Sequence, residues 1–252
     1  MASARYPWDF PPSIVPLPPA ETLELTEVTS DVEFPPLFRC LDNAYSRPHN
    51  SFWNIFKSDA KDEFVGRLTD WHNVDPSSHW IYVRDTRTNE IVAGTQWNFY
   101  PTSPFKIHQP VLTAYWLQEG TMIRSFADIC LERFFSRRPK YMNRPHLIIN
   151  WCGTHCEHRR RGAGRLMVEW GCKRADELGL DTFAESPDAG RPLFEAVGFI
   201  TVDDFYWDAD VEKPSKVWEA LTRRLEMPLH GYLMWRPPGG KFIEGKTTLP
   251  WE

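Results

Sequence analysis

The residues best suited to chemistry in this chain lie within 146–165, in the sequence HLIINWCGTHCEHRRRGAGR. An apolar run leads there into three arginines and then into Gly162-Ala163-Gly164, which is the order of a strand, a tight basic loop and a helix. Such a loop turns several backbone N–H groups toward one point, where the positive end of the helix dipole also emerges. The segment is therefore suited to hold an anion such as a pyrophosphate, and we expect the chain to bind a phosphorylated cofactor.

Two common nucleotide-binding motifs do not fit this segment. A dinucleotide fingerprint needs a third glycine where this chain has Met167, and a P-loop needs Gly-Lys-Ser/Thr, which is absent. The spacing Arg159-x-x-Gly162-x-Gly164 does resemble the R/Q-x-x-G-x-G/A motif of the GNAT acyl-CoA N-acetyltransferase superfamily. In that superfamily the loop holds the pyrophosphate of acetyl-CoA. A solvated arginine turn could carry the same residues, so the surrounding elements decide between the two.

Composition limits the class of protein. The chain has 252 residues, 42% of them apolar, which is enough for one large domain or two small ones with a sizeable core. A net charge of -5 disfavours nucleic acid as a partner. The sequence has no apolar signal run and no apolar segment of the ~20 residues that span a bilayer, so we expect a cytoplasmic protein without a membrane partner. Five cysteines, an odd number, indicate reduced thiols.

The elements before the basic loop are expected from their periodicity. Residues 1–20 read as a proline-rich arm, and 21–28 as a first strand. Helical pieces are expected within 37–56 and 60–74, followed by a hairpin of strands 79–83 and 91–100. Residues 101–145 then form an irregular segment with a helix over 119–137, whose Phe126, Ile129, Cys130 and Phe134 share one face. An inserted lid and a helix that simply covers the sheet both fit this pattern.

The elements after the loop supply its context. A helix is expected over 164–178, with Gly179 as its cap, then a strand at 181–186 and a short helix over 188–197 that Gly198 ends. Together with the stretches AESPDAGRPLFEAVGF and MWRPPGGK, this order resembles the fungal-type branch of the GNAT family. The resemblance covers roughly 21–245 and is best in 145–199. It implies an α/β GNAT fold over 21–252, with a central mixed, mostly antiparallel twisted sheet flanked by helices and a helical insertion at about 101–145, between strands 3 and 4.

The resemblance also implies how acetyl-CoA is held as a cosubstrate. The backbone of the strand before the loop would pair with the pantetheine arm, and the N–H groups and arginines of the loop would bind the pyrophosphate. The position of Phe194 would face the thiol. The residues expected to contact acetyl-CoA are Cys152, Gly153, Thr154, Arg159, Arg160, Arg161, Gly162, Ala163, Gly164, Arg165 and Phe194.

The proton donor and acceptor are where this chain departs from the family. Phe194 stands where many members have a tyrosine that protonates the leaving thiol, and phenylalanine cannot donate. Glu185 could accept a proton through water, Asn150 could orient an amine or a water, and His155 could titrate near neutral pH. For each of these a plain solvated or hydrogen-bonded role remains open. Where relatives often have Thr-Asp/His-Pro, this chain has Thr154-His155-Cys156.

A zinc site at Cys152, His155, Cys156 and His158 is disfavoured because no second ligand pair follows, and no metal is expected. Two functions from different classes stay open. The first is an acetyl-CoA-dependent N-acetyltransferase acting on a small amine or metabolite. An acidic rim would attract the cationic acceptor, unless it is only a solvated edge: Asp203, Asp204, Asp208, Asp210 and Glu212. The second is a GNAT-fold protein that has lost acetyl transfer and binds a ligand or catalyses another reaction in the acceptor cleft.

Overall fold

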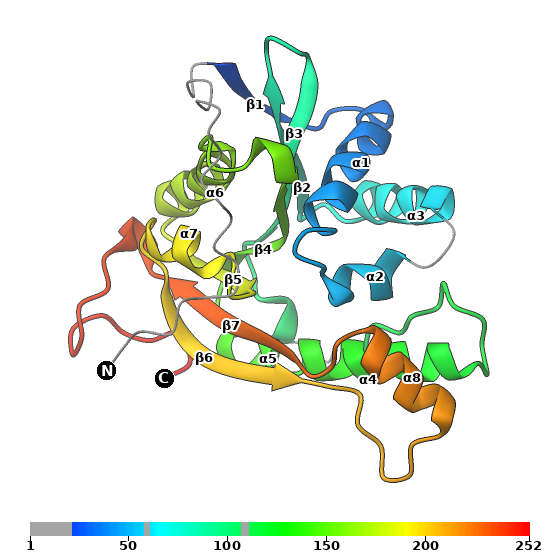
Figure 1. Ribbon diagram of the computed structural model, residues 1–252. Coiled ribbons are helices and arrows are strands. Elements are labelled where there is room, and N and C mark those ends of the chain that lie inside the picture. The colour runs from blue at the N-terminus through cyan, green and yellow to red at the C-terminus, as the bar shows by residue number, and fades with distance from the viewer. Residues whose placement is uncertain (1–21, 58–60, 107–110) are drawn as a thin grey trace, which may run out of the picture.

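A seven-stranded sheet crosses the part of the molecule that the computed structural model describes, which is residues 22–57, 61–106 and 111–252. The strand order is β1-β2-β3-β4-β5-β7-β6 (Figure 1). The strands are β1 (Leu23–Glu27), β2 (Ser78–Asp85), β3 (Glu90–Tyr100), β4 (His146–Thr154), β5 (Asp181–Ser186), β6 (Ile200–Trp207) and β7 (Leu229–Arg236). Strands β4 and β5 are parallel, and every other neighbouring pair is antiparallel. The predicted α/β class with a mixed, mostly antiparallel sheet is confirmed, whereas the arm predicted at 1–20 lies outside the described residues.

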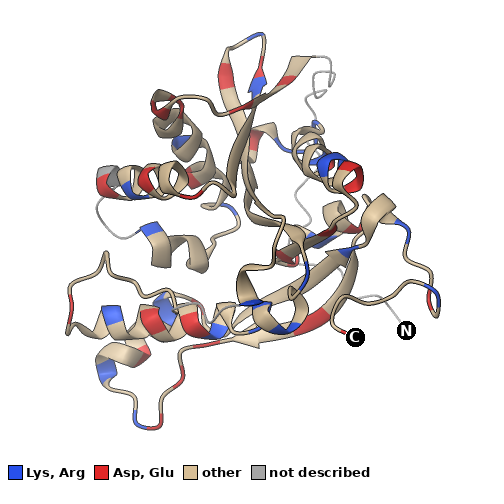
Figure 2. Ribbon diagram, turned by 180° about the vertical axis from the view of Figure 1, so that it is seen from behind, with Lys and Arg blue, Asp and Glu red and all other residues tan. Residues whose placement is uncertain are grey.

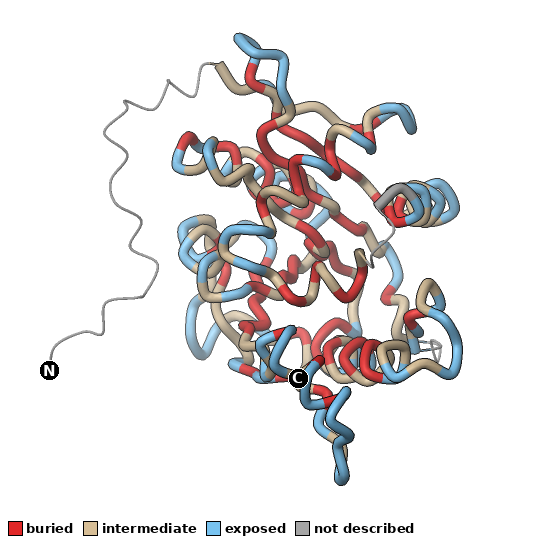
Figure 3. Tube along the Cα trace, turned by 45° about the vertical axis from the view of Figure 1, so that its right-hand side comes forward, coloured by how far each residue is buried: buried red, intermediate tan, exposed pale blue. Residues whose placement is uncertain are grey.

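Helices cover both faces of the sheet (Figure 1). One face carries α1 (Phe34–Ala44), α2 (Ser51–Lys57) and α3 (Lys61–Val74), and the other carries α6 (Ala163–Leu178) and α7 (Arg191–Glu195). Alternation along β2 explains the two layers: Trp80 and Tyr82 pack with the apolar side of α1, while Ile81 packs with Val168 of α6. The buried residues accordingly follow the sheet through the centre of the molecule (Figure 3).

The first helix begins earlier than its apolar pattern indicates. Helices were expected from residue 37, but α1 starts at Phe34 and holds two prolines in its first turn. The first turn tolerates proline because its N–H groups have no acceptor within the helix. The predicted hairpin is confirmed, with β2 and β3 each slightly longer than expected and paired in antiparallel fashion.

The segment between β3 and β4 contains α4 (Met122–Phe135) and α5 (Arg138–Tyr141). The predicted face of α4 is turned inward: Phe126, Cys130 and Phe134 are buried, and Ile129 is half-buried. Phe126 contacts Trp218 of α8 (Lys216–Arg224). The helix therefore covers the β6–β7 end of the molecule together with α8, and its apolar face belongs to the core.

Two elements of the second half were not predicted, and one was predicted too long. Strand β7 lies between β5 and β6 and is buried on both faces, so its sequence LHGYLMWR lacks the alternation of a half-exposed strand. Helix α8 was also missed, although Ser215 caps its first turn. Helix α7 spans only five residues, because a turn at 187–190 takes the place of its expected first turn. Short 3-10 turns lie at Asp31–Glu33, Pro104–Lys106, Cys156–His158 and Pro238–Gly240.

Candidate functional site

The two parallel strands of the sheet separate at their carboxyl ends. Strand β4 pairs with β5 only from His146 to Ile149. The next residue, Asn150, is a bulge: Trp97 of β3 pairs with Ile149 and Gln96 with Trp151, so Asn150 has no opposite residue. From Trp151 to Thr154, β4 therefore pairs with β3 alone, and we call the space between residues 150–154 and the end of β5 the β4–β5 gap (Figure 1).

The basic loop follows β4 directly and opens α6. Gly162 is the N-cap of α6 with φ of 95°, a left-handed conformation that glycine adopts without strain. The first helical hydrogen bond runs from the Leu166 N–H to the Gly162 carbonyl, 3.0 Å. The N–H groups of Ala163, Gly164 and Arg165 precede it, so they have no acceptor within the helix and emerge at its positive end. This geometry suits an anion, as the sequence predicts.

Contacts to the end of α1 hold the start of the loop. The Cys156 N–H donates to Asn43 Oδ1 at 3.0 Å. The Arg159 guanidinium donates to the Ala44 carbonyl at 2.8 Å, where the negative end of the α1 dipole favours a cation. In this structure Arg159 thus holds the loop against the C-terminal end of α1.

A buried ion pair holds the end of the loop. Arg161 Nη2 lies 2.5 Å from Asp85 Oδ2, and the two side chains are 3% and 1% exposed. Arg161 also donates to His158 Nδ1 at 2.8 Å. Burial raises the pKa of Asp85, but the hydrogen bonds from Arg161 and Arg87 and the charge of Arg161 together outweigh this, so the pKa lies well below its usual value. These contacts engage both Nη groups of Arg161, which leaves its backbone N–H for an anion.

The other two arginines of the loop face solvent. Arg165 is exposed and pairs with Glu169 one turn along α6, at 2.7 Å. Arg160 is exposed and has φ of 64°. Among the residues described by the structure, no hydrogen bond or ion pair engages its guanidinium, so Arg160 is the loop arginine best placed to meet a bound phosphate.

A buried polar chain crosses the sheet on the face opposite α6. Arg138 of α5 donates to both carboxylate oxygens of Glu185, at 3.0 and 2.6 Å, and to Asn150 Oδ1 at 2.9 Å. Asn150 donates to Asn98 Oδ1 at 2.6 Å, and Asn98 donates to Asp75 Oδ2 at 2.9 Å. The Arg138 and Glu185 side chains are only 11% and 5% exposed. We call this series from Glu185 to Asp75 the polar chain.

The polar chain brings together two of the three predicted catalytic candidates. Glu185 and Asn150 meet at Arg138 beside the β4–β5 gap, whereas His155 lies at the basic loop, where its ring contacts His158 at 5.2 Å. The Glu185 carboxylate is held in a two-point ion pair, so it is not a free base. Arg138 had no sequence signal, because its partners in the polar chain come from β4 and β5.

Phe194 lies inside the core of the α6 face. It is buried on α7 and contacts Phe199, with 5.3 Å between ring centroids. Its ring carries no polar atom. The Tyr232 hydroxyl on the same face donates to Asp188 Oδ1 at 2.9 Å and is thereby engaged.

One hydroxyl that the sequence analysis did not select does reach the β4–β5 gap. The Cys152 N–H donates to the Tyr45 hydroxyl oxygen at 3.0 Å. Tyr45 is the C-cap of α1, so no motif around it signals this contact with a strand 107 residues away. Burial raises the pKa of Tyr45 above its usual value, and the hydroxyl is protonated at neutral pH.

Neighbouring side chains pair with three of the five residues of the acidic run. Asp208 pairs with Arg133, Asp203 lies 3.5 Å from Arg137, and Asp204 accepts from His230 at 2.7 Å. Figure 2 shows acidic and basic residues interspersed along the helices. Among the described residues the carboxylates of Asp210 and Glu212 have no ion pair, so the expected acidic rim is paired only in part.

Metal ligation and membrane insertion find no support within the described ranges. In the part of the chain that the structure describes, no three His, Cys, Asp or Glu side chains are grouped as metal ligands. Burial raises the pKa of the Cys152 thiol to about 11, so it does not ionise readily near neutral pH. Among residues 22–57, 61–106 and 111–252, no helix has the length and apolar character that crossing a membrane requires.

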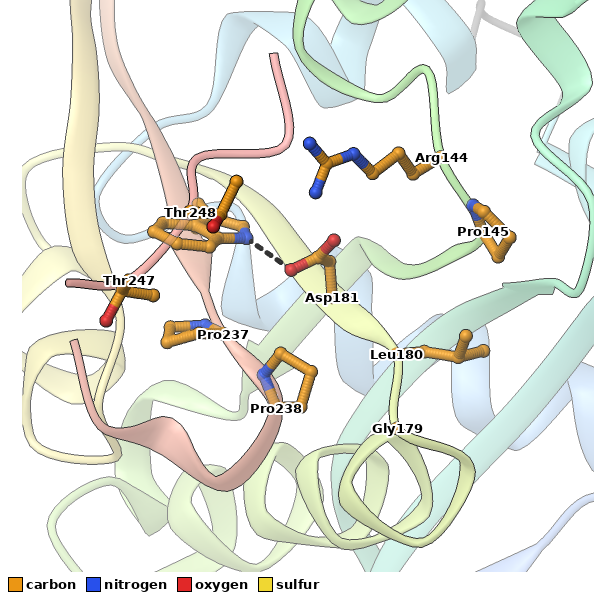
Figure 4. A pocket seen from close by; sticks show the side chains of 10 residues that line it. Arg144, Pro145, Gly179, Leu180, Asp181, Pro237, Pro238, Thr247 and Thr248 are labelled. Carbon is orange, nitrogen blue, oxygen red and sulfur yellow. Dashed lines mark hydrogen bonds between the residues drawn. The ribbon is translucent and has the colours of Figure 1, made fainter. Parts of the chain in front are cut away.

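An open pocket of about 350 Å³ lies at the opposite end of the sheet (Figure 4). Arg144 and Pro145 before β4, Leu180 and Asp181 at the start of β5, and Pro238 after β7 contribute to its wall. These residues sit at the amino ends of β4 and β5, whereas the basic loop and the β4–β5 gap lie at their carboxyl ends. The pocket is therefore separate from the candidate site.

Comparison with known proteins identifies the fold. No protein-family model and no curated protein matches this chain. A solved structure from Corynebacterium glutamicum, described as a histone acetyltransferase HPA2 and related acetyltransferase, shares 14% identity and covers 88% of this chain and 99% of its own, with a TM-score of 0.52. An agmatine N-acetyltransferase shares 12% identity and covers 86% of this chain and 99% of its own, with a TM-score of 0.56. These similarities establish the GNAT fold that the sequence resemblance implied.

Proposed function

We propose that this protein is an acetyl-CoA-dependent N-acetyltransferase acting on a small amine or metabolite. One observation carries the proposal: on a GNAT fold, the start of α6, with backbone N–H groups that have no acceptor within the helix, lies next to the β4–β5 gap. The N–H groups of Ala163, Gly164 and Arg165 would bind the pyrophosphate, and Arg160 would add its charge. The backbone groups of Gly153 and Thr154 and the Cys152 carbonyl would pair with the pantetheine arm, because the Cys152 N–H donates to the Tyr45 hydroxyl. The stretches within 145–199 support a place in the fungal-type branch.

The polar chain would bound the acceptor side of the gap. Because Arg138 holds the Glu185 carboxylate, Glu185 would orient an amine or a water, and the proton of the attacking amine would leave to water. Asn150 donates one side-chain hydrogen to Asn98, which fixes its amide with the oxygen toward Arg138. With Phe194 buried and without a hydroxyl, CoA would leave as a thiolate that water protonates.

Calorimetry with two ligands tests the anion site. The wild-type protein should bind acetyl-CoA, and Arg160→Glu should weaken this binding about 10–100-fold, the value of one charge-assisted hydrogen bond. Binding of acetyl-pantetheine, which lacks the pyrophosphate, should be the same in both proteins. Arg223→Glu on α8 is the matched control, because its side chain is 71% exposed and far from the loop in sequence. A wild-type protein that binds no acetyl-CoA would refute the proposal.

A second function is favoured by two observations, the missing hydroxyl at Phe194 and the ion-paired state of Glu185. On this alternative the protein binds acetyl-CoA or another ligand without transferring the acetyl group, or catalyses another reaction in the acceptor cleft. Release of CoA with a panel of small amines separates the two. Steady release with any amine supports the transferase, and binding without release supports the alternative.

A further inference from the structure

The β4–β5 gap contains a hydroxyl at the point where β4 lacks its second strand partner. Pairing with β5 ends at Ile149, and the Cys152 N–H donates at 3.0 Å to a side chain of α1, the Tyr45 hydroxyl. Amides inside a sheet normally pair with the neighbouring strand. Here the neighbouring strand has turned away, and Tyr45 takes its place.

Packing fixes the direction of the Tyr45 side chain. Its ring lies 4.7 Å from that of Trp53 and 6.0 Å from that of Trp151, between centroids. Gly153 allows the close approach of α1, since a Cβ at this position would lie 3.0 Å from Ala44 Cβ and 3.6 Å from Tyr45 Cζ. A larger residue there would push the end of α1 away from β4. The hydroxyl is therefore held at the strand by closely packed neighbours.

The hydroxyl is ready to donate. A tyrosine hydroxyl carries one hydrogen and can accept at its oxygen, and here the oxygen accepts from the Cys152 N–H. Across the described residues, the structure shows no acceptor for the Tyr45 O–H. Burial raises the pKa of Tyr45, so the proton remains on the oxygen at neutral pH. The N–H behind it polarises the O–H, which strengthens it as a donor.

We propose that Tyr45 donates a hydrogen bond to the thioester oxygen of acetyl-CoA and stabilises the oxyanion that forms there. This inference rests on the proposed function. The lone pair of the amine nitrogen forms the new C–N bond, and the π pair of the carbonyl moves to the oxygen held by Tyr45. Collapse of this oxyanion breaks the C–S bond and releases the CoA thiolate. The nitrogen gives its proton to water, and the thiolate takes one from water.

The assignment concerns the addition step and not the leaving thiolate, for which Phe194 offers no hydroxyl. A donor to the oxyanion lowers the barrier before the sulfur leaves, and the thiolate still takes its proton from water. Tyr45 is neutral and held rigidly, and both properties suit a donor aimed at developing charge.

Tyr45→Phe removes only the hydroxyl and retains the ring packing, and Tyr206→Phe, on an exposed side chain of β6, is its matched control. Infrared spectra of bound acetyl-CoA labelled with ¹³C at the carbonyl report the hydrogen bond without any acceptor amine. In the wild type and in Tyr206→Phe the carbonyl stretch should shift to lower frequency relative to free acetyl-CoA, and in Tyr45→Phe the shift should be lost. With an acceptor amine present, kcat of Tyr45→Phe should fall about 10²–10³-fold, while the KM for acetyl-CoA should rise by no more than about tenfold, the value of the hydrogen bond to the bound carbonyl.

A second measurement needs no substitution. S-ethyl-CoA lacks the carbonyl oxygen, so the wild type should bind acetyl-CoA roughly tenfold more tightly than S-ethyl-CoA, and less difference should remain in Tyr45→Phe. Equal carbonyl shifts in the wild type and Tyr45→Phe would overturn the role of Tyr45 and leave the proposed function intact. A wild-type carbonyl stretch equal to that of free acetyl-CoA would also overturn it. If neither protein binds acetyl-CoA, the proposed function falls, and the role of Tyr45 falls with it.

Discussion

Replacement of Asp85 by asparagine should destabilise this protein strongly and loosen its basic loop. The substitution keeps the shape of the side chain and removes its charge, which leaves the Arg161 guanidinium buried, 3% exposed, without a counter-ion. Breaking a buried ion pair from one side costs about 3–5 kcal/mol. For a chain of this size the melting temperature should fall by about 10 °C.

The pH dependence of the effect follows from the pKa of Asp85. This pKa is lowered in the folded protein, so the ion pair contributes stability above the unfolded value of about 3.9. The contribution is lost as the pH falls through the folded pKa. The free energy of unfolding measured in urea should therefore differ most between wild type and Asp85→Asn at neutral pH, and the difference should be smaller in acid. Acetyl-CoA affinity should fall as well, because Arg161 holds the end of the loop.

Two further variants test the reasoning. Arg87 also lies near Asp85, at 3.4 Å, but its side chain is 54% exposed, so Arg87→Ala should cost no more than about 1 kcal/mol. Adding Arg161→Met to Asp85→Asn removes both charges and should recover much of the lost stability. The free energy of unfolding at neutral pH decides between the two outcomes. If Asp85→Asn lowers it no more than Arg87→Ala does, the view that this ion pair anchors the loop is refuted.

Three other substitutions should change stability in a defined direction. Gly171→Ala places a Cβ 2.2 Å from an atom of the Trp97 ring and should destabilise the protein by about 1–3 kcal/mol. Gly66→Ala lies in open space on α3 and should stabilise it by roughly 0.5–1 kcal/mol. Melting temperatures that change in the same direction in both variants would contradict this. Burial lowers the pKa of His230, but hydrogen bonds to two aspartates outweigh it and raise the pKa above its usual value. The stability from these bonds is present below about pH 6.5 and is lost as the pH rises through the folded pKa. The difference in melting temperature between wild type and His230→Gln should thus be larger at about pH 6 than at about pH 9.

Local features explain why the strand, loop and helix around 146–178 could be predicted. The apolar run before the loop, Gly162 at positive φ and Gly179 as the helix cap each act within a few residues. Strand β7 could not be predicted in the same way, because burial on both faces removes the alternation by which a strand is recognised. Helix α1 begins at Phe34, before the expected residue 37, because the prolines that follow Phe34 fit the first turn of a helix.

Long-range contacts explain why the site was predicted less completely. Arg161 was selected as an anion ligand, but its side chain pairs with Asp85, 76 residues away in sequence. Glu185 was selected as a base, and its partner Arg138 lies 47 residues away in the segment between β3 and β4. Each of these pairings depends on how the sheet brings distant residues together, which the pattern of a single segment does not contain.

The polar chain from Glu185 to Asp75 has a consequence for how long the folded protein lasts. Its links join residues 47, 12, 52 and 23 positions apart, taken from different strands and helices. It can close only after β3, β4, β5 and α5 have assembled, so we expect its hydrogen bonds to form late in folding. Interactions that form after the transition state slow unfolding and leave the folding rate nearly unchanged. The polar chain should therefore lower the rate of global unfolding, because its hydrogen bonds must break before the strands beside the β4–β5 gap can separate.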